Sequence, residues 1–384
     1  MNKLFITLSL LSLILNACAQ GQTEKKVETN NTKEIQILPG INHHYVLNDY
    51  LSENPTLEKD VDSIFNSLDN QTRIAQLLMP AVGRLGLTNE VITDQIKKNL
   101  IGGVILLNGT KDEFTNWITA YNKLNPLHAS LPFLYSADAE PSLVNRKISG
   151  STIVSKANEI KSIDGVINCA TTISKDLNDI GINYNFAPVV DVSKNSTVGY
   201  RGFGAIPGNI IPWSNAFIKT TQEMGILATA KHFPGHGLVS GDTHKSLQMI
   251  DGELKEISNY PPLIKEGLLS IMVAHIAVVN NEKYDTKGLP ATASPEIVQK
   301  LLREEMNFKG LIVTDAMNMG GISSLPNAEI KVIEAGCDII LMPLDVVKSH
   351  ASLLAKYNSD SAFKKKVDAA VKRIIRMKLC LAKS

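Results

Sequence analysis

The chain has 384 residues, and its 39 Lys and Arg residues nearly balance its 38 Asp and Glu residues. That length excludes a small disulfide-stapled module, and 44% hydrophobic residues with only 5% aromatic ones predict an aliphatic globular core. A formal net charge of +1 removes the main sequence argument for nucleic-acid binding, because phosphate recognition needs a basic excess on one face. We therefore expect a small-molecule or glycan partner and no nucleic acid.

Residues 1–17 carry the pattern of an export signal. Lys3 provides a positive start, an apolar run of about a dozen residues follows, and Leu15-Asn16-Ala17 leads directly to Cys18. The run is shorter than the roughly twenty apolar residues that span a bilayer. The four residues ending at Cys18 resemble a bacterial lipobox, which implies cleavage before Cys18 and acylation of its thiol. An ordinary secretory signal with a chance Cys is the alternative.

Residues 18–54 are predicted to form a flexible tether between the lipidated Cys18 and a folded body. The stretch from Gln20 to about Glu34 has almost no apolar residue that could offset the entropy of ordering. We expect one folded domain at 55–384 and a lipid-anchored protein of the bacterial cell envelope. The outer membrane is slightly preferred, since Ala19 stands where some inner-membrane lipoproteins have Asp.

From about Val61 onward, short runs of Val, Ile and Leu alternate with longer stretches of amphipathic helical pattern. Continuously apolar runs are typical of parallel strands buried on both faces, and eight of them predict a (β/α)₈ TIM barrel. A doubly wound sheet is the alternative, but no Gly-x-Gly-x-x-Gly turn follows the first run. The eight runs are Leu77–Met79, Gly103–Leu107, Pro132–Ala137, Ile182–Pro188, Ile226–Ala230, Ile271–Ala274, Leu311–Thr314 and Asp338–Met342.

Polar residues stand at the carboxyl ends of five of these runs. In a barrel those ends meet on one face, where active sites are built, so residues far apart in sequence should surround one pocket. Asp191 could instead cap the segment that follows it, and Asp338 is assigned to a turn and left out of the site. The polar residues are Asp138, Asp191, Lys231-His232, His275 and Asp315.

The loop after the fifth run contains two histidine patterns. Pro234 and the neighbouring glycines are incompatible with a regular helix, so His232 and His236 are not expected to bind zinc as a helical pair. Asp242 and His244 are two residues apart and point the same way if the segment is extended. A carboxylate beside an imidazole fixes its tautomer and favours its protonated form, which suits proton transfer near neutral pH. Taken alone, such a pair is common and is better explained as a chance surface pair.

This loop, taken with three other segments, is similar to the single-domain β-N-acetylglucosaminidases of the family-three glycoside hydrolases, bacterial enzymes of peptidoglycan turnover. The resemblance extends through most of the body and implies the same barrel fold. The segments that carry it are Lys231–Gly237 with Asp242-Thr243-His244, Ile182–Val192, Arg201–Gly204 and Leu311–Met319.

The resemblance assigns roles to individual residues. Asp315 occupies the place of the nucleophile, which would attack the anomeric carbon and form a covalent glycosyl-enzyme; a helix N-cap is the alternative. His244 matches the general acid/base, with Asp242 as its partner. The loop after the third run departs from the family pattern Asp-Gln-Glu-Gly-Gly-Arg. The positions that match the family's substrate contacts are Asp138, Arg146, Arg201, Lys231 and His232.

The function implied is that of a monomeric, retaining exo-β-N-acetylglucosaminidase that removes terminal GlcNAc from peptidoglycan fragments or related glycans without a metal or organic cofactor. Three alternatives stay open: a metal-dependent barrel hydrolase, a sugar-binding lipoprotein without catalysis, and an enzyme that passes the same intermediate to phosphate. The first run lacks the His-x-His usual in metal-dependent barrels. The histidines of that alternative are His232, His236, His244 and His275.

Overall fold

The computed structural model describes residues 43–381, except 128–130, 193, 196 and 205–206. The predicted signal peptide, the lipidation site at Cys18 and most of the predicted tether lie outside these residues. Within the described part, no helix combines the length and the apolar character needed to cross a bilayer.

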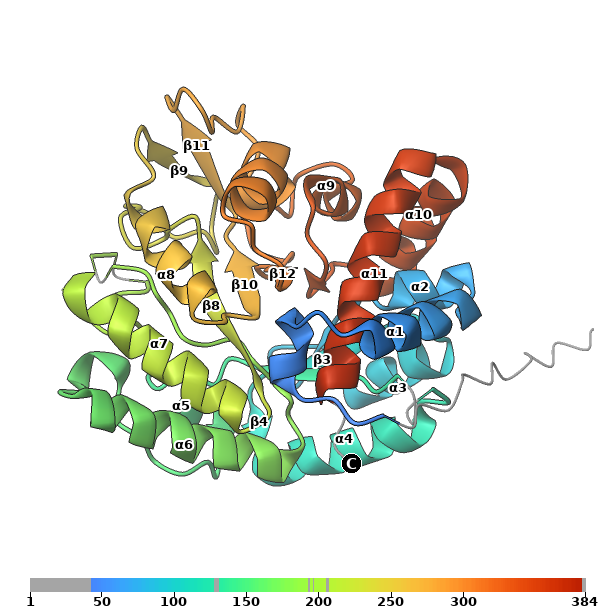
Figure 1. Ribbon diagram of the computed structural model, residues 1–384, viewed down its shortest axis with the longest axis horizontal. Helices are drawn as coiled ribbons and strands as arrows, with labels where there is room; N and C mark the ends of the chain where they lie inside the picture. Colours follow the sequence, from blue (N-terminus) through green and yellow to red (C-terminus); the bar gives the residue numbers. More distant parts are fainter. Residues whose placement is uncertain (1–42, 128–130, 193, 196, 205–206, 382–384) are drawn as a thin grey trace, which may run out of the picture. The chain divides into compact units, whose positions relative to one another are not determined.

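Parallel strands form the centre of the fold (Figure 1). Seven of them are hydrogen-bonded in the order β12-β10-β8-β7-β5-β3-β2, and every pair in this sheet is parallel. All eight runs expected from the sequence contain strands, so the prediction of eight parallel strands is confirmed. Their bounds are β1 (Leu78–Met79), β2 (Ala81–Val82), β3 (Gly103–Leu106), β5 (Leu134–Ala137), β7 (Tyr184–Asn185), β8 (Leu227–Phe233), β10 (Ser270–Val273), β12 (Leu311–Thr314) and β13 (Ile340–Leu341).

The sheet closes into a barrel through β13. β13 pairs in parallel with β1, which leads into β2 across Pro80, and a bridge between Val313 and Ile339 joins the β13 segment to β12. The backbone N–H of Met342 donates to the Met79 carbonyl at 2.8 Å, which continues this pairing beyond the strand. β1 and β2 are therefore two parts of one barrel strand, and the (β/α)₈ prediction is confirmed.

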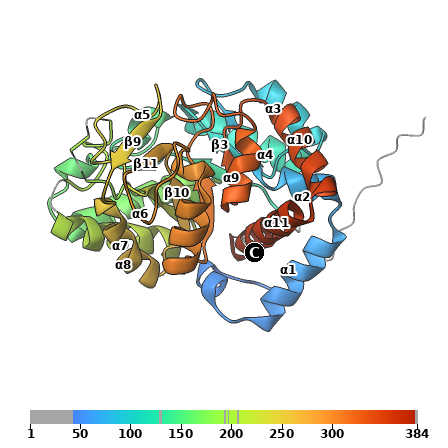
Figure 2. The same ribbon diagram turned by 90° about the horizontal axis from the view of Figure 1, so that it is seen from above.

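Helices surround the strands because each carries an apolar stripe that the barrel buries (Figure 2). In α6, Val166, Ala170, Ile173 and Leu177 recur at helical spacing and are buried. The helix begins after Ser162, whose side chain accepts the Gly165 N–H. The helices between strands are α3 (Asn89–Lys97), α4 (Lys111–Leu124), α6 (Ile163–Ile180), α7 (Pro207–Glu223), α8 (Tyr260–Lys265), the π-helical η5 (Glu296–Glu305) and α9 (Ala328–Ala335), and α10 (Val346–Ser359) follows β13.

Shorter elements lie in the connecting loops. β11 pairs with β9 and β4 with β6, each as a parallel two-stranded ladder outside the barrel. Their bounds, with those of the short helices, are β4 (Gly109–Thr110), β6 (Ile148–Ser149), β9 (Gln248–Asp251), β11 (Ile276–Val279), α5 (Val144–Lys147), η2 (Ala157–Glu159), η3 (Lys255–Asn259) and η4 (Ala291–Ala293).

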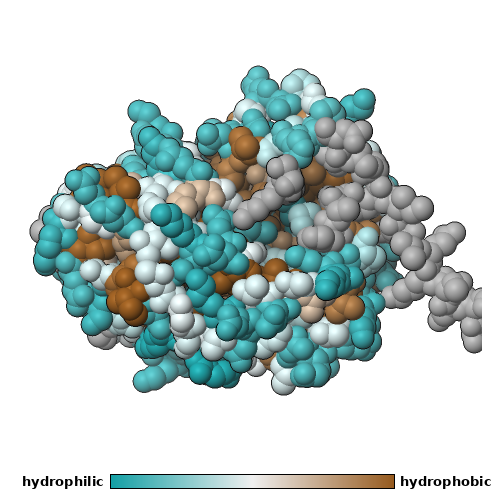
Figure 3. All heavy atoms as spheres, turned by 90° about the horizontal axis from the view of Figure 1, so that it is seen from below, coloured by the Kyte–Doolittle hydropathy of each residue, from teal (hydrophilic) through white to brown (hydrophobic). Residues whose placement is uncertain are grey.

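The folded part begins before residue 55, which corrects the predicted end of the tether. Tyr45, Leu47 and Tyr50 are buried, because the short helix η1 (Leu47–Leu51) packs against the last helix, α11 (Ser361–Leu381). The Arg376 guanidinium on α11 donates to the carbonyls of Tyr50 and Ser52. The helices α1 (Pro55–Ser67) and α2 (Asn70–Ala75) also pack on α11. On the face drawn in Figure 3, hydrophobic residues form separate patches among hydrophilic ones.

Candidate active site

A cavity of about 410 Å³ opens at the carboxyl ends of the barrel strands. Its wall includes residues that follow β2, β3, β5, β8, β12 and β13, as expected for a barrel whose loops meet on one face. Seven of the eight catalytic and substrate-binding residues predicted from the sequence line it. They are Asp138, Arg146, Arg201, Lys231, His232, His244 and Asp315. Asp242 is not part of the wall but contacts His244.

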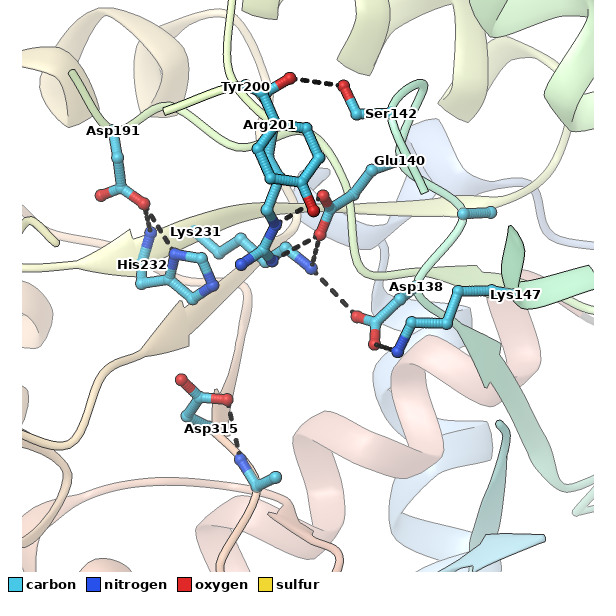
Figure 4. Close-up of polar contacts among 12 residues, drawn as sticks. Asp138, Glu140, Ser142, Lys147, Asp191, Tyr200, Arg201, Lys231, His232 and Asp315 are labelled. Atoms are coloured by element: carbon cyan, nitrogen blue, oxygen red, sulfur yellow. Dashed lines mark hydrogen bonds and ion pairs between the residues drawn. The ribbon is translucent and has the colours of Figure 1, made fainter. Parts of the chain in front are cut away.

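Asp315 follows β12 directly. Its backbone N–H donates to the Val273 carbonyl at 2.9 Å, and its Oδ1 accepts the Ala316 N–H at 2.8 Å. Burial alone would raise the pKa of Asp315, but the neighbouring His232 and His275 and the Ala316 N–H lower it overall. The next helix, α9, begins only at Ala328, so Asp315 is not a helix N-cap. The residue offers an ionised carboxylate to the cavity (Figure 4).

His275 supports the turn that carries Asp315. Its Nε2 lies 3.1 Å from the Ala316 carbonyl, which can only accept, so Nε2 carries the proton. Its Nδ1 lies 2.8 Å from the Thr292 hydroxyl and accepts from it in this tautomer. Burial lowers the pKa of His275 and so disfavours protonation of its imidazole. His275, the polar residue at the end of the sixth predicted strand, thus supports the turn that carries Asp315 through a hydrogen bond to Ala316.

Asp242 and His244 form the contact that their spacing suggested, but in a turn and not in an extended segment. Asp242 Oδ1 accepts the His244 backbone N–H at 3.0 Å and lies 2.7 Å from His244 Nδ1. Asp side chains favour such local turns because they bond the backbone two residues on. Desolvation acts to raise the pKa of Asp242, yet these hydrogen bonds lower it overall. The arrangement leaves His244 Nε2 free to exchange a proton.

A charged cluster forms one side of the cavity (Figure 4). Lys231 Nζ lies 3.0 Å from Asp138 Oδ1 and 2.5 Å from Glu140 Oε1. Arg201 grips Glu140 with two parallel hydrogen bonds of 2.9 and 2.7 Å. Burial by itself would raise the pKa of Asp138, but Lys231 and Lys147 outweigh it and hold that pKa below its ordinary value. Two carboxylates after β5 and two cations, one on β8 and one in the loop after β7, are thus held together.

The loop after β5 places its two basic residues differently. Lys147 Nζ lies 3.5 Å from Asp138 Oδ2. The side chain of Arg146 lines the cavity and is exposed, and no ion pair or hydrogen bond joins it to another described residue. The Ser142 hydroxyl, at a position where the family has Gly, donates to the Tyr200 carbonyl at 2.6 Å. The departure from the family pattern therefore adds a bond between this loop and the one that carries Arg201.

Asp191 holds His232 in place and does not cap a helix. Its Oδ2 accepts the His232 backbone N–H at 3.1 Å and lies 2.6 Å from His232 Nδ1. Its Oδ1 accepts the His236 backbone N–H at 2.8 Å. Burial would raise the pKa of Asp191, but its contacts with His232 and His236 lower that pKa overall. A buried carboxylate thus sets the orientation of an imidazole that lines the cavity.

Glu256, on η3, explains two of the glycines in the loop after β8. Its carboxylate accepts the backbone N–H groups of Val192 and Leu238, which joins the loops after β7 and β8. A Cβ on Gly235 would lie 2.6 Å from Glu256 Cβ, and one on Gly237 would lie 2.0 Å from the Val192 carbonyl oxygen. Burial and the nearby Asp191 raise the pKa of Glu256 to about 7. Close packing around this carboxyl therefore requires glycine at both positions.

Among the described residues, no group of three or more His, Cys, Asp or Glu side chains is arranged to hold a metal ion. The imidazoles of the metal-dependent alternative have separate partners: Asp191 for His232, Thr243 for His236, Asp242 for His244 and Thr292 for His275.

Sequence reasoning missed Glu140 and the positioning role of Asp191. Glu140 lies two residues after Asp138, so in extended chain both carboxylates face the same side, and this spacing was a usable signal. Asp191 was noticed at a strand end, but a helix cap and an imidazole partner give the same sequence pattern. Glu256 had no signal, because its partners lie in two loops far from it in sequence.

Comparison with known proteins gives one consistent result. Residues 69–377 match the model of the glycosyl hydrolase family 3 N terminal domain. The chain is 31% identical to a β-hexosaminidase A of Pseudoalteromonas piscicida over 66% of this chain and 48% of that protein. It is 29% identical to a β-hexosaminidase of Methylococcus capsulatus over 68% and 80% of the two chains. A solved β-N-acetylhexosaminidase of Beutenbergia cavernae superposes with a TM-score of 0.74 at 27% identity, covering 81% of this chain and 98% of that one.

The length of these proteins differs. The chain spans about half of the Pseudoalteromonas protein but nearly all of the Beutenbergia one.

Proposed function

The chain belongs to the family-three glycoside hydrolases, and we propose that it is a retaining exo-β-N-acetylglucosaminidase. The observation that carries the proposal is one cavity lined by an ionised carboxylate, an exposed imidazole with its own carboxylate partner, and a cluster of fixed charges. The names of the relatives point to a β-linked hexosamine, because they are β-hexosaminidases.

In the proposed reaction, Asp315 attacks the anomeric carbon and forms a glycosyl-enzyme ester. His244 gives its proton to the departing oxygen, and the neutral imidazole then takes a proton from the water that attacks the ester. Asp242 stabilises the imidazolium form of His244 by its contact with Nδ1. The cluster of Asp138, Lys231 and Arg201 binds hydroxyl groups of the sugar, since ionised donors and acceptors make the strongest hydrogen bonds.

The finer parts of the proposal concern the natural substrate and the place of action. We propose peptidoglycan fragments with a terminal β-linked GlcNAc as the substrate class, and a lipid on Cys18 as the anchor in the cell envelope. The sequence pattern of residues 1–18 supports the anchor, and the resemblance stated above supports the substrate. Labelling of the protein with a radioactive fatty acid, and its loss in Cys18→Ala, would test the anchor.

The enzyme activity is tested with an aryl N-acetyl-β-glucosaminide and a slowly hydrolysed fluoro-sugar of the same configuration. We expect release of the aryl alcohol and, after trapping, a peptide from residues 311–319 that carries one sugar on Asp315. The aryl β-glucoside without the acetamido group is the control and should react far more slowly. Absence of turnover with the acetamido substrate, or a sugar on another residue, would contradict the proposal.

A comparison of products formed with and without phosphate decides which acceptor is used. Free GlcNAc in both buffers supports hydrolysis, whereas a sugar phosphate in phosphate buffer alone supports transfer to phosphate.

A further inference from the structure

The loop after β8 is exposed where it carries the proposed acid/base, yet its backbone is fastened to the loop after β12. His244 has 58% of its side chain exposed. The backbone N–H of Gly320 donates to the His244 carbonyl, and that of Gly321 donates to the Thr243 carbonyl, each at 3.0 Å. Gly320 lies five residues after Asp315. The segment that carries the proton donor is therefore hydrogen-bonded to the segment that carries the nucleophile.

Close approach of the two loops explains why both positions are glycine. A Cβ on Gly320 would lie 2.3 Å from the Lys245 carbonyl oxygen, and one on Gly321 would lie 2.9 Å from the Cβ of His275. Neither glycine has a positive φ, so their conformation is open to other residues. Any side chain on Gly320 would meet backbone atoms, which cannot rotate away, and the two loops would have to separate.

Thr243 fixes the same loop from its other side. It is 1% exposed, whereas His244 next to it lies on the surface. Its Oγ1 lies 2.9 Å from Nε2 of His236, which is itself buried and tied to Asp191 through its backbone N–H. The side chain of Asn195 donates to the Gly241 carbonyl at 3.0 Å. The buried side chain of Thr243 thus anchors the segment that carries Asp242 and His244.

We propose that Thr243, Gly320 and Gly321 form a latch that positions His244 for proton transfer. The three are positioning residues: they act through His244, and the inference rests on the function proposed above. The latch fixes the proton donor relative to the loop of the nucleophile, so its loss should harm steps that need a proton and spare sugar binding. In the proposed function, sugar binding depends on the cluster of Asp138, Lys231 and Arg201. Thr243 lines the same cavity, but among the described residues no hydrogen bond or ion pair joins the latch to that cluster.

Leaving-group dependence tests the latch in the full chain. The variants are Gly320→Ala, which forces the loops apart, and Thr243→Val, which keeps the shape but removes the hydroxyl. Thr243→Ser restores the hydroxyl, and Gly208→Ala adds the same methyl group at a glycine with no heavy atom within 4 Å of the added Cβ. kcat and KM are measured with aryl N-acetyl-β-glucosaminides whose aryl alcohols range from dinitrophenol to phenol.

The latch predicts a selective loss. With phenol as leaving group, kcat/KM of Gly320→Ala and Thr243→Val should fall by about 10²-fold, the usual size of general acid catalysis. With dinitrophenol, which departs without a proton, kcat/KM should fall by less than about three-fold. Thr243→Ser and Gly208→Ala should stay near wild type. In Gly320→Ala and Thr243→Val, kcat and KM for the dinitrophenyl substrate should fall together, because His244 also assists the attack of water on the glycosyl-enzyme in the second step.

Two results would overturn the latch: an equal loss for every leaving group, or wild-type kinetics in Thr243→Val. If Gly320→Ala fails to fold, Thr243→Val alone decides the question, because it adds no bulk. Wild-type turnover is measured in the same series and distinguishes failure of the latch from failure of the proposed glycosidase function. No turnover in wild type refutes the proposed function, whereas normal wild-type kinetics with unaffected latch variants refute the latch only.

Discussion

At the scale of single residues, removing the carboxylate of Asp315 should stop turnover and leave the sugar site intact. Asparagine has the same shape, can still accept the Ala316 N–H, and cannot act as the nucleophile. We expect kcat of Asp315→Asn to fall by at least about 10³-fold, as is usual when a group that forms the covalent bond is lost. Affinity for GlcNAc, measured by calorimetry, should stay within about three-fold of wild type.

The control for this substitution is Asp112→Asn, on an exposed residue of the first turn of α4. It should leave kcat and affinity unchanged. A kcat of Asp315→Asn within about ten-fold of wild type, measured on protein purified away from contaminating hydrolases, would remove Asp315 from the role of nucleophile.

Asp242 gives a second test at this scale, because its role is to stabilise charge on His244. Its low pKa keeps it ionised at mildly acidic pH, so the negative charge stands beside Nδ1 under all ordinary assay conditions. Asp242→Asn should lower kcat/KM for a phenyl glycoside by about 10²-fold and change it little for a dinitrophenyl glycoside.

The matched control for Asp242 is Asp251→Asn, a change to an exposed residue at the end of β9. It should follow wild type with both substrates. If Asp242→Asn also follows wild type with the phenyl glycoside, the carboxylate does not assist proton transfer.

At the scale of elements, the loops after β5, β7 and β8 are held together by charge. Glu140 is fully buried and is shared by Arg201 and Lys231. Glu140→Gln leaves the buried Lys231 and the partly buried Arg201 with Asp138 as the remaining carboxylate in the cluster. Breaking a buried pair in this way typically costs about 3–5 kcal/mol. We expect a lower free energy of unfolding in urea and a raised KM, because Arg201 and Lys231 lose their fixed positions.

Glu159→Gln is the control, since Glu159 pairs with Lys156 on the surface at 3.6 Å with both side chains more than half exposed. Such surface pairs contribute about 0–1 kcal/mol, so its unfolding curve should overlay that of wild type. If the unfolding curve of Glu140→Gln also overlays that of wild type, the charged cluster does not stabilise the contact between the loops after β5, β7 and β8.

The elements also show how far sequence reasoning reaches. The eight strands could be predicted because each is a short apolar run whose side chains are buried on both faces, and the charged residues at their ends followed from the same periodicity. The segment that contains Tyr45, Leu47 and Tyr50 was assigned to the tether because polar residues surround these three in the sequence. Their burial depends on the contact with α11, which the local sequence does not reveal. Glu256 and the latch glycines could not be predicted for a related reason: each acts between loops that only the closed barrel brings together.

At the scale of the whole molecule, α11 packs against η1, α1 and α2, the first elements that the structure describes. It also carries a buried lysine that has no carboxylate partner within the described ranges. Lys378 is 1% exposed, and its Nζ donates to Gln76 Oε1 and to the Gly102 carbonyl, each at 2.7 Å. Neither partner carries a negative charge, so burial lowers the pKa of Lys378 to about 7. In the unfolded chain the same amine has its ordinary pKa, near 10.5.

This difference predicts how stability changes with pH. Below pH 7 the amine is charged in both states, and the folded state bears the full cost of burying that charge. Between pH 7 and about 10 the unfolded state holds a proton that the folded state has released, so stability rises with pH by about 1.4 kcal/mol per unit. The rise ends above the ordinary pKa, where the amine is neutral in both states.

Substitution of Lys378 isolates this effect from other titrations. The free energy of unfolding in urea is measured from about pH 6 to about pH 10 for wild type, Lys378→Met and Lys365→Met, the last on an exposed lysine of the same helix. Relative to Lys378→Met, wild type should gain stability steadily above pH 7, whereas Lys365→Met should run parallel to wild type. The sign of the effect follows from burial alone, because Gln76 and Gly102 offer hydrogen bonds but no charge. Curves of wild type and Lys378→Met that stay parallel across this range would mean that the amine keeps its proton in the fold, and that α11 admits a counter-charge or water to this position.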